Sequence, residues 1–99
     1  MTNLLPIGSV VLLEGAQRKL MIYGRLQRQD EQEKIWDYIG CLYPEGQIRP
    51  EDSYLFDHKG IETVVFTGYQ NEEEVAFQKY MSEELSKLTG ELNIVEDVL

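Results

Sequence analysis

The first two thirds of the chain consist of short apolar runs separated by turn residues. The runs occupy residues 9–14, 19–28, 35–43, 54–56 and 63–69. Runs this short, bounded by Gly, Pro and polar clusters, predict β-strands, because a helix needs a longer segment to bury one face. The wholly polar residues 29–34 predict a solvated hairpin loop. We therefore expect a strand-rich body of about five strands over residues 8–69.

Two glycines and one turn indicate that these strands are sharply bent. Gly24 and Gly40 each interrupt a predicted strand, and an internal strand glycine often marks a bulge or a bend. Residues 58–61 predict a single 3₁₀-type turn before the last strand. These features favour a small, strongly bent antiparallel β-barrel or sheet of SH3-like type. A helix over residues 52–65 is the alternative for one segment, although the β-branched run at 63–65 opposes it.

The periodicity changes to that of a helix after residue 70. Apolar side chains recur with spacings of four, four and three residues at Phe77, Met81, Leu85 and Leu88. Asn71 is the predicted N-cap, and Gly90 is the predicted C-terminal stop. The sequence therefore predicts one amphipathic helix over residues 72–89, followed by an acidic tail, 90–99, that packs on the body, pairs as an edge strand or stays loose. The predicted fold class is α+β, in one domain over residues 1–99.

Charge separates the two parts of the chain and excludes some classes of partner. Nine Lys and Arg stand against eighteen Asp and Glu, a net charge of −9. Residues 70–99 hold two of the basic and eight of the acidic residues, a net of −6. A chain this acidic repels a phosphate backbone. The sequence also lacks an apolar run of about 20 residues and a signal-peptide start, so we expect a cytoplasmic protein.

The residues that most often carry chemistry do not form a recognisable catalytic or metal-binding motif. Cys41, the one cysteine, lies in an apolar strand where a small buried side chain is the usual role. His58 lies in a predicted turn, and no cluster of further ligands lies near it in the sequence. Phosphate-binding, dinucleotide-binding and calcium-binding motifs are absent. We therefore predict a non-enzymatic protein with no catalytic residues, no cofactor and no metal.

Aromatic residues indicate a protein-binding surface. Six Tyr, three Phe and one Trp in 99 residues exceed what so small a core can bury, and exposed Tyr and Trp beside Arg are typical of interfaces. The strand pattern places Tyr23 and Arg25 on one face of their strand. The predicted contact surface consists of Tyr23, Arg25, Trp36 and Tyr38. The acidic helix is a second candidate, because its exposed face fits a basic partner.

Four segments of the body carry a family resemblance. These are Leu5–Leu13, Lys19–Arg25, Asp37–Gly46 and Phe66–Tyr69. In this order they resemble a family of small uncharacterised proteins from Gram-positive bacteria, over residues 4–75. Members of that family are often encoded beside LXG-type toxins and the small helical partners of type VII secretion. The resemblance implies an accessory, chaperone-like role and transfers no site residues.

These observations lead to one functional hypothesis and two alternatives. The hypothesis is a cytoplasmic accessory factor that binds a secreted LXG-type toxin or a small helical secretion protein. One alternative is a single-stranded nucleic-acid binder, since basic residues gather on the first hairpin at Arg18, Lys19, Arg25 and Arg28. The other is an immunity protein that neutralises the toxic domain.

Overall fold

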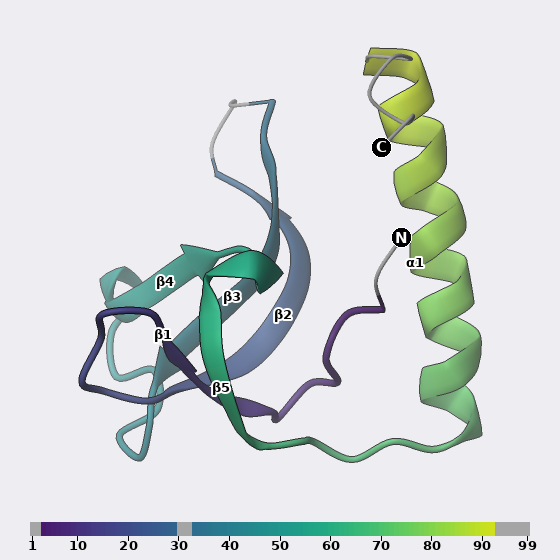
Figure 1. The fold of residues 1–99 in the computed structure, drawn as a ribbon. Coiled ribbons are helices and arrows are strands. Elements are labelled where there is room, and N and C mark those ends of the chain that lie inside the picture. The colour runs from purple at the N-terminus through teal and green to yellow at the C-terminus, as the bar shows by residue number, and fades with distance from the viewer. Residues whose placement is uncertain (1–2, 30–32, 93–99) are drawn as a thin grey trace. The chain divides into compact units, whose positions relative to one another are not determined.

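Five strands and one helix make up the described chain. The computed structural model describes residues 3–29 and 33–92 (Figure 1). The strands are β1 (Val10–Leu13), β2 (Leu20–Arg28), β3 (Ile35–Leu42), β4 (Ser53–Phe56) and β5 (Ile61–Phe66), and the helix is α1 (Glu72–Leu92). Two 3₁₀ turns, Pro50–Asp52 and His58–Gly60, precede β4 and β5. The predicted turn before the last strand is therefore confirmed.

All five strands belong to one antiparallel sheet with the order β4-β3-β2-β1-β5. Together with α1 this confirms the predicted α+β class. The predicted barrel or sheet is an open sheet and not a closed barrel. β4 pairs with β3 and β5 pairs with β1, so β4 and β5 form the two separate edges. The chain divides into a body, Leu4–Tyr69, and a second unit that contains α1. The boundary falls where the charge and the periodicity of the sequence change.

A bulge at Gly24 bends β2, as the sequence predicted. Ile22 pairs with Gly40, whereas Gly24 already pairs with Ile39, so β2 holds one extra residue. Leu26 has a φ of 54°, a left-handed conformation that is uncommon for a non-glycine residue. After the bulge, every side chain of β2 lies on the opposite face from the one that simple alternation predicts.

The core of the body lies against the central strands. Its most buried apolar side chains are Leu4, Val10, Val11, Leu20, Ile22, Tyr38, Cys41 and Phe56. Gly40 allows the close approach of β2 to β3, since a Cβ at this position would lie 2.8 Å from the carbonyl oxygen of Met21. The prediction that Cys41 is buried is confirmed, and burial raises the pKa of its thiol.

The start of α1 is the one the sequence predicts, whereas its end is not. The Asn71 side-chain oxygen accepts hydrogen bonds from the N–H groups of Glu73 and Glu74, both at 3.1 Å, which confirms the N-cap. The helix continues through Gly90 to Leu92, so the predicted stop at Gly90 is wrong. A glycine costs a helix only about 1 kcal/mol, and no proline follows to enforce termination.

Some predictions fall on residues outside the described ranges. They concern residues 30–32 of the polar loop and residues 93–99 of the acidic tail. Within the described residues, no helix is both long enough and apolar enough to cross a membrane.

Candidate protein-interaction surface

Tyr38 is the centre of a polar network in the body. Its side chain is completely buried, and its ring packs 5.4 Å from that of Phe56. The Tyr38 hydroxyl oxygen accepts a hydrogen bond from the N–H of Leu5 at 2.9 Å and lies 2.6 Å from Nδ1 of His58. Tyr38 therefore lies in the core and not on the predicted contact surface, because the segment that precedes β1 covers its hydroxyl.

Burial raises the pKa of Tyr38 to about 12, and this has a consequence for stability at alkaline pH. An unfolded tyrosine loses its proton near pH 10. Between about pH 10 and about pH 12 the folded state thus holds more protons than the unfolded state, and the free energy of unfolding falls as the pH rises through this window. Urea unfolding followed by circular dichroism at several alkaline pH values measures this decline. The Tyr38→Phe variant should show a smaller decline, and an equal decline would contradict the assignment to Tyr38.

Arg25 fixes the same segment from the neighbouring strand. It pairs with Tyr38 across β2 and β3, and its Nη1 donates to the carbonyl oxygen of Leu5 at 3.2 Å. The two backbone groups of Leu5 are therefore held by one side chain from β2 and one from β3. Arg25 acts as a structural anchor of the N-terminal segment in addition to any role in binding.

A chain of polar contacts holds the turn that carries His58. The N–H of His58 donates to Asp37 Oδ2 at 2.8 Å, and the N–H of Asp37 donates to Asp57 Oδ1 at 3.1 Å. Asp57 also forms a salt bridge with Lys34 at 2.9 Å. These contacts tie β3 to the 3₁₀ turn before β5, which is a structural role for the one histidine.

Trp36 lies on the face of β3 that also carries Tyr38, two residues further along the strand. It pairs with Gln27 in β2 and is half-buried, and Nζ of Lys34 lies 4.5 Å from the centroid of its ring. The indole Nε1 is buried and has no hydrogen-bond partner within residues 3–29 and 33–92. Trp36 thus retains partial exposure beside the cationic side chain of Lys34.

Tyr23 lies away from the other three predicted residues. Its hydroxyl is 2.6 Å from the Ser53 hydroxyl and accepts a hydrogen bond from Gln47 Nε2 at 2.8 Å. Because the bulge at Gly24 reverses the alternation, Tyr23 and Arg25 lie on opposite faces of β2. The structure therefore brings Arg25, Trp36 and Tyr38 to one face and separates Tyr23 from them, so the predicted shared face of Tyr23 and Arg25 is wrong.

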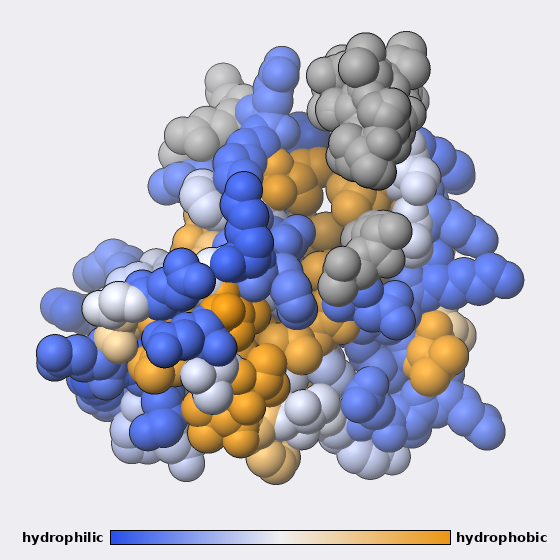
Figure 2. All heavy atoms as spheres, in the orientation of Figure 1, coloured by the Kyte–Doolittle hydropathy of each residue, from blue (hydrophilic) through white to orange (hydrophobic). Residues whose placement is uncertain are grey.

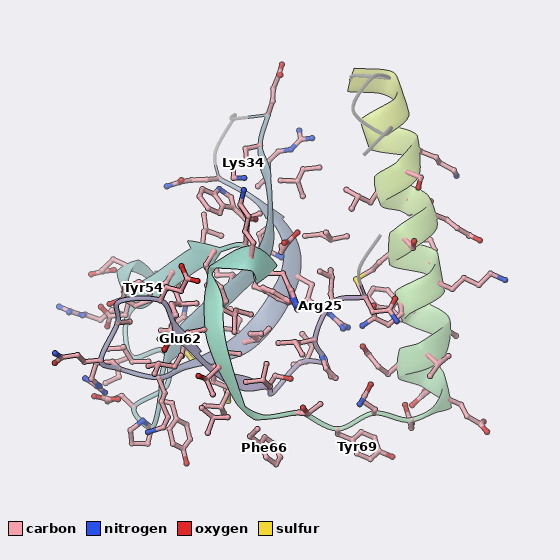
Figure 3. The ribbon with its side chains drawn as sticks, viewed as in Figure 1. Arg25, Lys34, Tyr54, Glu62, Phe66 and Tyr69 are labelled. Carbon is pink, nitrogen blue, oxygen red and sulfur yellow. The ribbon has the colours of Figure 1, made fainter. Side chains whose placement is uncertain are left out.

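A different group of exposed apolar side chains was missed by the sequence analysis. The group consists of Ile7, Val64, Val65, Phe66 and Tyr69, which we call the end patch. It extends around the edge of the sheet at β5, because Val64 pairs with Val11 and Phe66 with Val10, which places Val64 and Phe66 on opposite faces of that edge. Phe66 is 60% exposed and Tyr69 is 79% exposed. Apolar residues gather over this end of the body in Figure 2, and Figure 3 shows the Phe66 and Tyr69 rings along the same edge. The available signal was the absence of charge over residues 63–71.

Two segments distant in sequence meet beside the end patch. The hydroxyl oxygen of Ser9, which is fully buried, accepts the N–H of Gly68 at 2.9 Å. A Cβ on Gly68 would lie 2.2 Å from the carbonyl oxygen of Ile7, closer than any real Cβ approaches. Gly68 therefore allows the turn at Ile7 and the segment after β5 to lie directly against one another.

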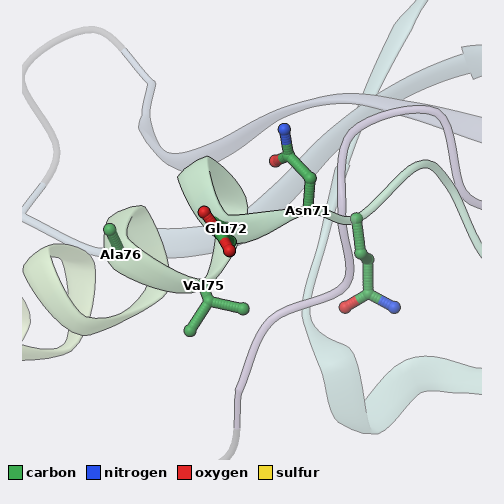
Figure 4. A pocket seen from close by; sticks show the side chains of 5 residues that line it. Asn71, Glu72, Val75 and Ala76 are labelled. Carbon is green, nitrogen blue, oxygen red and sulfur yellow. The ribbon is translucent and has the colours of Figure 1, made fainter.

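The start of α1 bears an open pocket (Figure 4). It is lined by Gln70, Asn71, Glu72, Val75 and Ala76. Asn71 already uses its side-chain oxygen to cap the helix, and Glu72 adds negative charge at this end. The pocket therefore offers no cationic group for an anion.

Among the described residues, no group of three or more His, Cys, Asp or Glu side chains is arranged to hold a metal ion.

The basic residues of the first hairpin are partly neutralised. Arg18 forms a salt bridge with Glu45 at 2.6 Å, and this hydrogen-bonded contact lowers the pKa of the Glu45 carboxyl. Arg25 is directed to Leu5, as described above. These contacts reduce the positive surface that a nucleic acid would meet.

Comparison with known proteins assigns a family and no function. The model of a family described as a domain of unknown function, DUF4176, matches residues 4–77. The match covers the whole body and the first residues of α1, including every segment that carried the sequence resemblance. No curated protein and no solved structure matches the chain.

Proposed function

Because this chain belongs to the DUF4176 family, a domain of unknown function, we propose a role for it from its surfaces: it is a non-enzymatic protein-interaction module. In this proposal it acts in the cytoplasm as a chaperone-like accessory factor for an LXG-type effector of type VII secretion. The gene context that the sequence resemblance implies supports the choice of effector. The surface of α1 supports binding as the activity.

The observation that carries the proposal is an exposed aromatic pair on α1, surrounded by acid. Phe77 and Tyr80 are 46% and 54% exposed, and their rings stack with centroids 5.7 Å apart. At 100° per residue, Glu73 and Glu84 lie on the same side of the helix as this pair. We call these four residues the α1 contact face. Lys87 follows on the same side and forms a salt bridge with Glu84 at 3.4 Å, so Glu73 supplies the uncompensated negative charge nearest to the pair. Aromatic anchors flanked by carboxylates suit a partner segment that presents apolar side chains between Lys or Arg residues.

The partly exposed Trp36, with Lys34 over its ring, supports a second point of contact. Arg25 lies on the same face of the sheet as Trp36, but its side chain holds the carbonyl oxygen of Leu5. Substituting Arg25 would therefore disturb the body as well as any interface. Trp36→Ala is therefore the variant that tests this point of contact by itself.

A pull-down with charge-reversal variants tests the α1 contact face. The tagged full chain should recover an LXG-type toxin or a small helical secretion protein from its host lysate in near-stoichiometric amounts. Tyr80→Arg places like charge against a basic partner, and we expect at least a roughly tenfold loss of recovery. Val75→Arg is the matched control, since Val75 is 66% exposed and lies on another side of α1.

Three outcomes would count against the proposal. Equal recovery with Tyr80→Arg and the wild type would remove the α1 contact face. Recovery of nuclease-sensitive RNA-binding proteins would favour the nucleic-acid alternative. Binding to the isolated toxic domain, with loss of its toxicity, would favour the immunity alternative.

A further inference from the structure

The end patch is uncharged in a protein whose net charge is −9. Charged residues make up 27% of the chain, yet residues 3–13 and 63–71, which supply the patch, contain none. Five apolar side chains here are between 42% and 79% exposed. Such a patch of apolar surface on a small protein commonly marks a contact with another macromolecule.

From this distribution of charge we propose that the end patch is the contact surface between two copies of this chain. Two molecules of net charge −9 repel one another, and most faces would bring carboxylates together. At the end patch, two copies meet without bringing negative charges against one another. A basic partner, in contrast, gains nothing from an uncharged surface and is attracted to the carboxylates of α1. The proposal is thus independent of the proposed function, which rests on the α1 contact face.

The second copy docks through side chains and not by extending the sheet. Val10 pairs with Phe66 and Val11 with Val64, so Val65 is an extra residue in β5, and Glu62 is another. Bulges of this kind on an edge strand disfavour regular pairing with a further strand. Phe66 and Tyr69 remain available as aromatic anchors, because both rings lie mostly in water.

The size of the patch indicates reversible association. A standard interface covers roughly 800 Å² on each partner, with about 20–30 residues a side. The five side chains of the end patch are divided between the two faces of the sheet edge, so they supply only part of such an interface. We therefore expect a dimer that forms with increasing protein concentration. An isologous arrangement, in which each copy presents the same patch, closes at two molecules and does not continue into a filament.

Sedimentation velocity of the full chain tests the proposal over a concentration series at about 0.05 M and about 0.5 M NaCl. The dimer should strengthen at the higher salt concentration, because salt screens the repulsion between the acidic chains and leaves apolar contacts intact. Phe66→Glu and Tyr69→Glu should each weaken dimerisation at least roughly tenfold. Tyr54→Glu is the control, since Tyr54 is 45% exposed on β4, at the other edge of the sheet.

Each result decides for or against the proposal. A wild-type chain that remains monomeric at every concentration and salt overturns it, and so does a dimer that Tyr69→Glu leaves unchanged. A dimer that weakens as salt rises shows that charged groups form the contact, which also overturns it. Circular dichroism identifies any variant that fails to fold, and Tyr69, the most exposed of the five, provides the variant least able to affect folding.

Discussion

Replacing Gly68 with alanine should lower the free energy of unfolding by about 3 kcal/mol. The added Cβ would lie 2.2 Å from the Ile7 carbonyl oxygen and 3.0 Å from the backbone nitrogen of Ser9. Both are backbone atoms, so no side-chain rotation relieves the overlap. Moving the segment away would also lengthen the hydrogen bond from the Gly68 N–H to the buried Ser9 hydroxyl. The loss is a large share of the roughly 5–15 kcal/mol that stabilises a typical domain.

Gly60→Ala is the matched control for this substitution. A Cβ at Gly60 meets no atom within 4 Å, and its φ lies outside the left-handed region. We expect a change of about 0.5 kcal/mol or less, or a small gain from the reduced freedom of the unfolded chain. Urea denaturation monitored by circular dichroism measures both variants. Equal stability of the two would show that the segment after β5 does not lie against Ile7 as described.

Replacing Tyr38 with phenylalanine should cost about 2 kcal/mol although it removes a single oxygen atom. The ring keeps its packing against Phe56, but the N–H of Leu5 and Nδ1 of His58 both lose the hydroxyl. An unsatisfied buried donor costs more than the hydrogen bond itself contributes, because water cannot replace the missing partner. Arg25 would still hold the carbonyl oxygen of Leu5 in the segment before β1.

Hydrogen exchange distinguishes this local effect from general destabilisation. The amide of Leu5 should exchange faster in Tyr38→Phe by more than the global loss of stability accounts for. Tyr54→Phe is the control, because it removes the same hydroxyl from a residue that is 45% exposed. Unchanged protection of Leu5 would contradict the role of the Tyr38 hydroxyl.

Gly68→Ala and Tyr38→Phe both concern one structural feature, the attachment of the segment before β1 to the rest of the body. Ser9 and Gly68 join it to the segment after β5, while Tyr38 and Arg25 join it to the centre of the sheet. The same attachment positions Ile7 in the end patch. We therefore expect changes in the attachment to affect the proposed dimer, and changes to the exposed side chains of the patch to leave the attachment intact.

Local sequence signals determined the elements of this protein. Short apolar runs between turn residues predicted the five strands, because runs of this length are too short for a helix that buries one face. The His58–Gly60 turn and the N-cap at Asn71 were also identified correctly, since both depend on residues within one turn. Gly24 indicated the bulge itself.

The tertiary structure alone decided which side chains reach the surface. The bulge at Gly24 reversed the faces of β2, and this separated Tyr23 from Arg25 in a way that pairing with β3 reveals and alternation does not. The N-terminal segment buried Tyr38, while the position of β5 at the edge of the sheet left Phe66 exposed. Strand formation depends on neighbours in the sequence, whereas exposure depends on neighbours in space. For this reason the sequence by itself predicted the sheet and the helix, and only the fold located the end patch.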